Sequence, residues 1–188
     1  MMQKPSQLIG VGTLTCVFGR RGSGKSNFLR LLQRRWDLIG VVSVDAVTVY
    51  KGEKAPVDHL VHHPTAVKQS WKPTLLTVDE ADEFLPVHGI PDPYLIDLVR
   101  RGRHKGVSVV LATQRPASLS QHAWALADNV FCFQLTAKRD LERIAELDGE
   151  IAEHVDRIRA LEPGICLHWN PRNRPAIQWL RFPLDKSP

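Results

Sequence analysis

The sequence has few cysteines and no long apolar run, and these absences exclude several classes of protein. Its three cysteines, Cys16, Cys132 and Cys166, lie far apart, and no CxxC pair is present. A zinc site or redox motif built on paired cysteines is therefore disfavoured, and buried reduced thiols in a cytoplasmic protein are expected. The longest apolar runs, such as residues 107–112, are much shorter than the roughly 18 residues that cross a bilayer. The first residues also lack a charged region followed by an apolar one, so we expect neither a secretory signal nor membrane insertion.

The composition is that of an ordinary globular protein. The 188 residues are 43% hydrophobic and 24% charged, which suits one domain spanning residues 1–188. The formal net charge of +5 is compatible with a nucleic-acid partner, although charge alone identifies none.

Short apolar segments alternate with amphipathic segments, which is typical of a mostly parallel sheet with helices on both faces. The expected strands are residues 14–19, 41–50, 75–80, 107–114 and 130–135, with a closing pair at 164–169 and 176–182. The expected helices are residues 25–36, 93–104, 118–127, 137–147 and 151–161, and residues 51–73 are expected to be irregular. The predicted fold class is α/β, with a mostly parallel central sheet, flanking helices and a C-terminal strand pair.

Residues 19–26 read GRRGSGKS and match the phosphate-binding pattern GxxxxGK[ST] at every fixed position. They follow an expected strand and begin an expected helix, which is the context that this pattern requires. Glycines allow backbone N–H groups to converge on phosphate oxygens, and the helix N-terminus adds a favourable dipole. Lys25 is expected to reach the β- and γ-phosphates of ATP, and the Ser26 hydroxyl to bind Mg²⁺. The predicted nucleotide-binding residues are Gly19, Arg20, Arg21, Gly22, Ser23, Gly24, Lys25, Ser26 and Asn27.

Two adjacent carboxylates, Asp79 and Glu80, end the expected strand at residues 75–80. A parallel strand presents its last residues at the ligand-binding edge of the sheet. We expect Asp79 to hold Mg²⁺ through its water shell, and Glu80 to orient and deprotonate the water that attacks ATP. The alternative is that these acids only cap a turn, because Asp82 and Glu83 continue the acidic run.

A polar pair, Thr113-Gln114, ends the apolar strand expected at residues 107–114. Polar residues are unusual at this position unless they face a ligand. Gln114 is therefore a candidate to contact the γ-phosphate or the attacking water, and the alternative is that it caps the segment that follows.

The segment from Arg100 to Pro116, RRGRHKGVSVVLATQRP, resembles the HerA/FtsK superfamily of DNA-pumping ATPases. In that superfamily a basic helix precedes a strand that ends in TQRP. The segments FQLT at 133–136, RDL at 139–141 and LEPG at 161–164 are also similar to its C-terminal half, and the resemblance covers residues 10–170. It implies a RecA-like P-loop NTPase fold in which the strand bearing Thr113 and Gln114 lies between the two catalytic strands.

The same resemblance implies a homo-oligomeric ring, usually a hexamer, that moves DNA and binds ATP between subunits. It also implies that an arginine of one subunit reaches its neighbour's nucleotide, since a guanidinium stabilises charge on the transferring phosphoryl group. Arg100, Arg101 and Arg103 are the candidates, with Arg103 preferred; a solvated helix face or a DNA phosphate contact is the alternative. The small size resembles the compact genome-packaging ATPases of tailless, membrane-containing viruses. That likeness implies double-stranded DNA, a capsid or portal-type partner, and a location in the host cytoplasm or the virion.

Two other functions stay open on the sequence. Assembly or export factors similar to the zonula occludens toxin-like ATPases of filamentous phages share the phosphate loop and the basic approach to a strand ending in Gln, but usually carry a membrane segment. A nucleotide kinase would need an arginine-rich lid over a small acceptor, and the Asp79-Glu80 pair favours ATP hydrolysis instead.

Residues 51–73 carry several basic side chains and the pattern HxxHH at His59, His62 and His63. No cysteine or carboxylate cluster nearby completes a metal site. Together with Lys51, Lys54 and Lys68 these histidines could line a loop that contacts DNA phosphates, or form a solvated surface.

Overall fold

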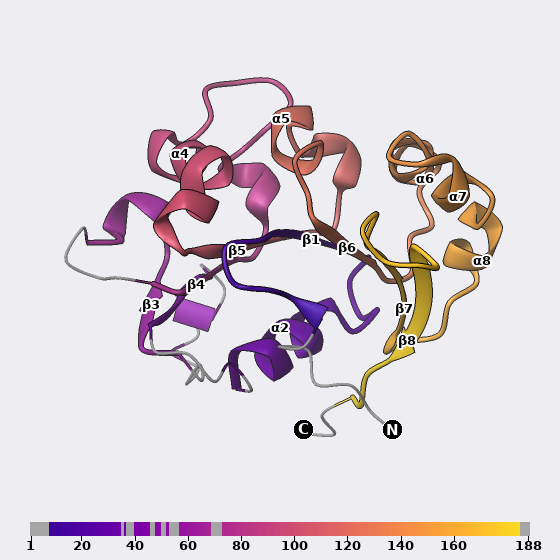
Figure 1. Ribbon diagram of the computed structural model, residues 1–188, viewed down its shortest axis with the longest axis horizontal. Helices are drawn as coiled ribbons and strands as arrows, with labels where there is room; N and C mark the ends of the chain where they lie inside the picture. Colours follow the sequence, from indigo (N-terminus) through magenta and orange to yellow (C-terminus); the bar gives the residue numbers. More distant parts are fainter. Residues whose placement is uncertain are drawn as a thin grey trace.

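A computed structural model describes residues 8–34, 36, 40–45, 48–49, 52, 57–68 and 73–184. In these residues an eight-stranded sheet forms the centre of the molecule, in the order β3-β2-β4-β5-β1-β6-β7-β8 (Figure 1). Neighbouring strands from β3 to β6 pair in parallel, whereas β7 and β8 are antiparallel additions. The predicted mostly parallel sheet and C-terminal strand pair are therefore confirmed. The strands are β1 (Leu14–Phe18), β2 (Val41–Val44), β3 (His59–Val61), β4 (Leu75–Val78), β5 (Ser108–Thr113), β6 (Asn129–Cys132), β7 (Ile165–Trp169) and β8 (Ile177–Arg181).

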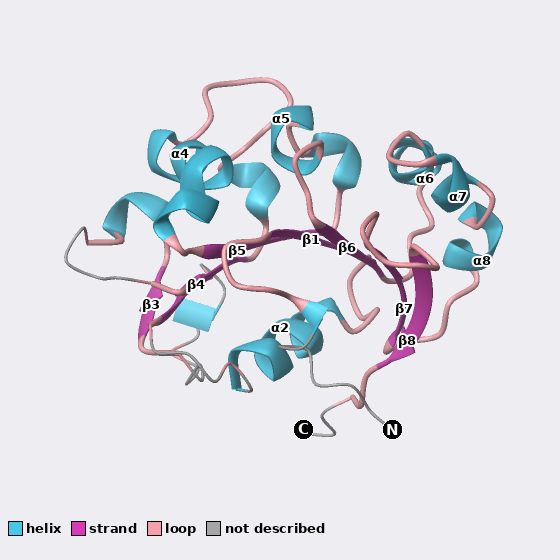
Figure 2. Ribbon diagram, viewed as in Figure 1, coloured by secondary structure: helices cyan, strands magenta, loops and turns pink. Residues whose placement is uncertain are grey.

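Helices cover both faces of this sheet (Figure 2). Helix α2 (Lys25–Arg34) lies on one face, and α4 (Pro93–Arg101) and α5 (Gln121–Trp124) lie on the other. Three short helices flank the end of the sheet that carries β7 and β8: α6 (Lys138–Ala145), α7 (Gly149–Ala152) and α8 (Val155–Arg159). The 3₁₀ turns are η1 (Pro64–Ala66), η2 (Ala81–Glu83), η3 (Gly102–Lys105) and η4 (Pro116–Ser118).

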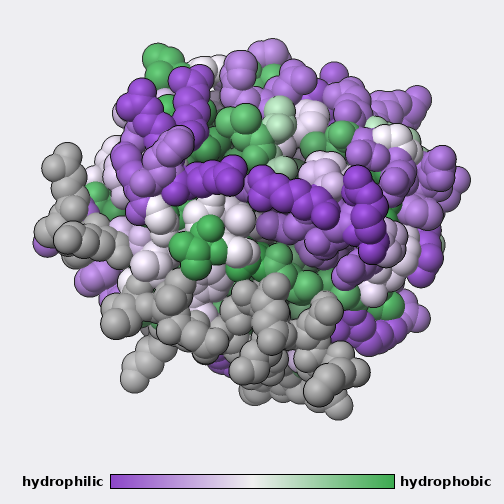
Figure 3. Space-filling model, in the orientation of Figure 1, coloured by the Kyte–Doolittle hydropathy of each residue, from purple (hydrophilic) through white to green (hydrophobic). Residues whose placement is uncertain are grey.

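The alternation of side chains along each strand divides the core into two layers. On β1, Leu14, Cys16 and Phe18 pack on the side of α4 and α5, whereas Val17 packs on the side of α2 with Phe28. Burial on both faces explains why the parallel strands read as continuous apolar runs. Small hydrophobic areas lie among wide hydrophilic ones on the face shown in Figure 3.

The structure differs from the prediction in two segments around β3. The strand predicted at residues 41–50 ends at Val44, and the Asp45 side chain beyond it accepts hydrogen bonds from the Thr48 backbone and hydroxyl. The segment predicted to be irregular, residues 51–73, contains the edge strand β3 and the turn η1. Lys51 and Lys54, which the sequence suggested for a basic loop, lie outside the described residues.

Two predicted helices are shorter than expected. The helix predicted at residues 118–127 is reduced to η4 and the single turn α5, and the one at 151–161 is divided into α7 and α8 around Glu153 and His154. Single turns of this kind are stabilised by packing on the sheet and not by their own length.

The cysteines provide a test of this core. Cys16, Cys132 and Cys166 are free and fully buried, as the sequence predicts. Burial raises the pKa of the Cys16 thiol to about 12, and it also raises the pKa of Cys132 and Cys166. Because the thiolate is the reactive form, we expect all three to resist alkylation at pH 8 in the native protein and to react rapidly in denaturant. Mass spectrometry over time measures this, and rapid native labelling of all three would contradict the fold.

Gly19, the residue after β1, occupies a position with no room for a side chain. A Cβ there would lie 2.5 Å from Ser23 Oγ and 2.8 Å from Phe133 Cβ. The Phe133 Cβ is attached directly to the backbone, so the loop and the end of β6 would have to separate. Gly149, in the first turn of α7, has nothing within 4 Å of the corresponding point.

We expect Gly19→Ala to lower the free energy of unfolding by about 1–3 kcal/mol through overpacking. The matched variant Gly149→Ala should leave that free energy unchanged or raise it by up to about 1 kcal/mol, since alanine is the better helix former. Urea unfolding of both variants gives the comparison. Equal stability of the two variants would show that the loop does not pack against Phe133 in this way.

Candidate active site

Three neighbouring strands end at the same edge of the sheet, and the residues that follow them form the candidate site. The phosphate loop follows β1, Asp79 and Glu80 follow β4, and Gln114 follows β5. Strand β5 lies between β4 and β1, so the arrangement implied by the resemblance is confirmed. The sequence-predicted groups, which are up to 95 residues apart, are thus brought together by parallel pairing.

The backbone of the loop needs glycine at two positions. Gly22 has φ 79° and Gly24 has φ 107°, which are conformations that other residues rarely adopt. A Cβ on Gly24 would also lie 3.0 Å from the Gly164 backbone nitrogen. The loop therefore curls tightly while its surface stays free of side chains at these points, as a phosphate cradle requires.

The C-terminal part of the chain holds this loop in place, which the sequence did not predict. The Gly164 N–H donates to the Ser23 carbonyl at 2.9 Å, and the Asn27 side chain donates to the Pro183 carbonyl at 2.5 Å. The Arg20 backbone and Nε both donate to Gln134, at 2.9 and 2.6 Å. Arg20 and Asn27, predicted to bind nucleotide, thus anchor the loop to the segments that follow β6 and β8.

Opposite charges meet between the loop and β4. The Lys25 ammonium lies 2.5 Å from Asp79 Oδ1 and 3.9 Å from Glu80 Oε1, and its side chain is only 5% exposed. Gln114 Nε2 donates to Glu80 Oε1 at 2.5 Å. A chain of contacts therefore links four of the predicted catalytic or metal-binding residues: Asp79, Lys25, Glu80 and Gln114.

Glu80 has an unusual backbone for its type. Its φ of 51° and ψ of 49° lie in the left-handed region, and it is the one non-glycine residue with positive φ among those described. Such a conformation costs about 1–2 kcal/mol and is often found at functional sites. The strained backbone directs the Glu80 side chain towards Gln114.

A cavity of about 510 Å³ opens beside these groups, and it is lined by Ser26, Asp79, Glu80 and Gln114, among others. A second hollow of about 240 Å³ continues along the phosphate loop past Gly24, Lys25 and Asn27. The Ser26 hydroxyl and the Asp79 carboxylate face the same space, and oxygen ligands of this kind suit Mg²⁺. The residues present thus fit MgATP.

A buried polar network sets the position of helix α2 behind this cavity. Gln33 Nε2 donates to Thr77 Oγ1 at 2.7 Å and to Ser43 Oγ at 3.2 Å, and Thr77 donates to Ser43. The network ties α2 to β4 and β2, whose ends carry the acidic residues. It was not predicted, because its members are single polar residues in apolar segments.

The three candidate arginines lie away from this edge. Arg103 and Arg100 line a hollow with Gly12 and Leu14, at the start of β1. The length of β1, about 16 Å for its five residues, separates them from the phosphate loop. Arg101 pairs with Asp97 at 3.5 Å, whereas the described residues offer no ion pair or hydrogen bond to the side chains of Arg100 and Arg103. A contact between Arg103 and the nucleotide of its own subunit is therefore disfavoured.

The histidines of the HxxHH pattern form no metal centre with the other described residues. The His63 ring instead accepts from the Thr65 N–H at 3.2 Å, caps η1 and lies edge-on to Phe84. No helix in the described part of the chain has the length and apolar character to cross a membrane.

No protein-family model and no curated protein matches the sequence. Solved structures do match the fold. The genome packaging NTPase B204 of Sulfolobus turreted icosahedral virus 2, in complex with AMPPCP, has a TM-score of 0.69 at 19% identity, over 92% of this chain and 98% of that one. The N-terminal domain of zonular occludens toxin from Neisseria meningitidis gives 0.53 at 16%, over 94% and 96%. EssC (ATPases 2 and 3) from Geobacillus thermodenitrificans gives 0.63 at 14%, over 94% and 40%.

These neighbours have the fold of P-loop NTPases, and they include a viral genome-packaging NTPase and the EssC ATPases. The phosphate loop, the strand order and these neighbours together show that the chain has the RecA-like P-loop NTPase fold that the resemblance predicted.

Proposed function

We propose that this protein binds MgATP at residues 19–26, hydrolyses it with Glu80 as the base, and uses the energy to move DNA. The observation that carries the hydrolysis is the contact of Lys25, Asp79, Glu80 and Gln114 beside an open cavity. A positive charge for the phosphates, an acid for Mg²⁺ and a base for water are the groups that ATP hydrolysis requires.

Each residue has a role that follows from its place. Lys25 leaves Asp79 to neutralise the β- and γ-phosphates, and Ser26 and Asp79 hold Mg²⁺. When bound, Mg²⁺ neutralises charge on the phosphate oxygens. Glu80 accepts a proton from the attacking water, and Gln114, which contacts Glu80, orients that water.

The coupling to DNA movement is supported by the fold and by charge. The structural similarity to the packaging NTPase B204 extends over 92% of this chain and 98% of B204. The present sequence also carries a net charge of +5. We propose a ring, with a hexamer as the expected form, double-stranded DNA as the substrate and a capsid or portal-type partner. In such a ring Arg103 of one subunit contacts the nucleotide of the next.

A phage assembly or export factor is the second candidate, and the similarity to the zonular occludens toxin domain favours it. The two functions predict different responses to DNA. A DNA motor is expected to hydrolyse ATP faster when DNA is present, whereas an assembly or export factor is not.

The test is steady-state ATP hydrolysis with and without double-stranded DNA, with Lys25→Ala as the control. We expect hydrolysis by the unaltered protein, stimulation by DNA, and loss of activity in Lys25→Ala, because the charge that neutralises the phosphates is removed. Activity that DNA leaves unchanged would favour the assembly factor. Normal turnover by a folded Lys25→Ala protein would refute the proposed site.

Arg103 provides a test of the ring. Arg103→Ala should retain ATP binding and assembly but lose hydrolysis by about 10³-fold or more, as expected for an arginine that stabilises phosphoryl transfer. The matched variant Arg101→Ala should hydrolyse normally, since Arg101 pairs with Asp97.

Mixing Arg103→Ala with Glu80→Gln subunits should partly restore activity. Alone, Glu80→Gln should bind ATP and hydrolyse it about 10²-fold or more slowly, because an amide cannot accept the water's proton. In mixed rings some interfaces pair an intact Glu80 with an intact Arg103. Normal hydrolysis by Arg103→Ala would transfer the role to Arg100 or Arg101. Normal hydrolysis by Arg100→Ala, Arg101→Ala and Arg103→Ala alike would exclude a trans-acting arginine from this segment.

A further inference from the structure

The ends of β4 and β5 are joined by side chains after their backbone pairing stops. The ladder between these strands ends at Val78 and Leu111, and Asp79 N–H bonds instead to Val44 of β2. Beyond that point two hydrogen bonds connect the strand ends: Gln114 Nε2 donates to Glu80 Oε1, and Thr113 Oγ1 donates to Asp82 Oδ1, each at 2.5 Å. The first bond joins Gln114 to Glu80, the proposed base. The second involves Thr113, which is the last residue of β5 and directly precedes Gln114.

Thr113 is fully buried, and its polar groups connect three segments of the site. Its hydroxyl donates to Asp82 and accepts from the Arg115 N–H at 2.9 Å, while its carbonyl accepts from the Gly19 N–H at 3.3 Å. The same residue therefore contacts the start of the phosphate loop and the turn after β4.

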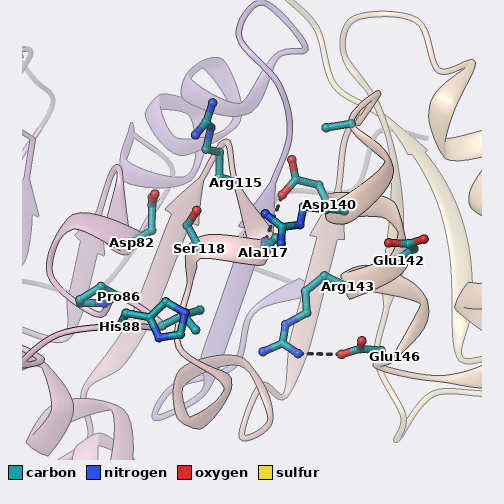
Figure 4. Close-up of a pocket in the computed structure, with 13 residues that line it drawn as sticks. Asp82, Pro86, His88, Arg115, Ala117, Ser118, Asp140, Glu142, Arg143 and Glu146 are labelled. Atoms are coloured by element: carbon teal, nitrogen blue, oxygen red, sulfur yellow. Dashed lines mark hydrogen bonds and ion pairs between the residues drawn. The ribbon is translucent and has the colours of Figure 1, made fainter.

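The Asp82 carboxylate accepts its hydrogen bond from Thr113, although it borders a region with several charged side chains. It lies on the wall of a cavity of about 810 Å³ that also holds Arg115, Asp140 and Arg143 (Figure 4). There Asp140 accepts from the Ala117 N–H at 3.0 Å, and Arg143 pairs with Glu146 at 2.7 Å. Among the described residues no cation pairs with Asp82, and Thr113 is its hydrogen-bond donor.

The strained Glu80 lies between these two fixed points. On one side Asp79 bonds to β2, and on the other Asp82 bonds to Thr113, so both ends of the short turn are held. A left-handed conformation at a non-glycine residue persists only where its surroundings enforce it. If Asp82 were released, Glu80 could relax, and relaxation would move its carboxylate away from Gln114.

We propose that Thr113 and Asp82 are a positioning pair, whose hydrogen bond holds Glu80 in the left-handed conformation that aims its carboxylate at the attacking water. The proposal rests on the proposed ATP hydrolysis, but it concerns residues that touch neither the nucleotide nor the water.

The test compares Thr113→Val with Thr15→Val. Valine has the shape of threonine but no hydroxyl, and Thr15 is a fully buried threonine on the adjacent strand β1 whose hydroxyl has no partner among the described residues. Thr113→Val should lower kcat about tenfold or more, because small misplacements of a catalytic group have effects of this size. The KM for ATP should stay within about twofold, since no phosphate contact is lost. Thr113→Ser should restore most of kcat, and Thr15→Val should match the unaltered protein.

A second variant removes the same hydrogen bond from its other side, so the proposal can still be tested if Thr113→Val misfolds. Asp82→Ala removes the acceptor from a partly exposed turn and should lower kcat in the same way. The double variant should be no worse than the poorer single one, because both remove one interaction. Additive losses, or equal losses in Thr113→Val and Thr15→Val, would overturn the proposal.

A crystal structure of Thr113→Val separates this proposal from the proposed function. We expect Glu80 to leave its φ of 51° and its contact with Gln114. If Glu80 keeps both, the positioning pair is refuted whatever the activity. If the unaltered protein hydrolyses no ATP, the proposed function fails, and the backbone of Glu80 in this variant still decides whether the pair holds the turn.

Discussion

Strand β5 pairs in parallel with β1 on one side and with β4 on the other, and these two ladders place every group of the candidate site. They align the phosphate loop, the acidic pair and Gln114 at one edge. A shift of either ladder by one residue would turn each strand's side chains to the opposite face. The two core layers oppose such a shift, because Leu111 belongs to one layer and Val110 to the other.

The charges at this edge satisfy one another before any ligand enters. Lys25 is almost fully buried against Asp79, and a buried ammonium without a partner would be strongly unfavourable. Under the proposed function, binding of MgATP would exchange this ion pair for two new contacts: phosphate for Lys25 and metal for Asp79. Because Lys25 is already buried and held beside the cavity, little reorganisation of its side chain would be needed when the ligand arrives.

The parts of the site that could be predicted are those whose residues are close together in the sequence and form a recognisable motif. Residues 19–26 and the pair Asp79-Glu80 are local patterns next to apolar strands. The edge strand β3 could not be predicted, because it is three residues long, half-buried, and defined by its pairing with β2. The bond between Thr113 and Asp82 spans 31 residues and depends on how two strand ends diverge, which no local pattern encodes. One domain over residues 1–188, and the ring, stay predictions.

The location of Arg103 at the start of the strands has a consequence for symmetry. An arginine on one edge that acts at the opposite edge of another copy requires two different surfaces to meet. In a head-to-tail assembly such a contact is heterologous, because it joins two different patches of the surface. Head-to-tail contacts either close into a cyclic assembly or continue as a filament, and in both every subunit both gives and receives the same contact. If Arg103 acts in trans as proposed, each active site is shared by two subunits, and an isolated subunit would contain no complete one.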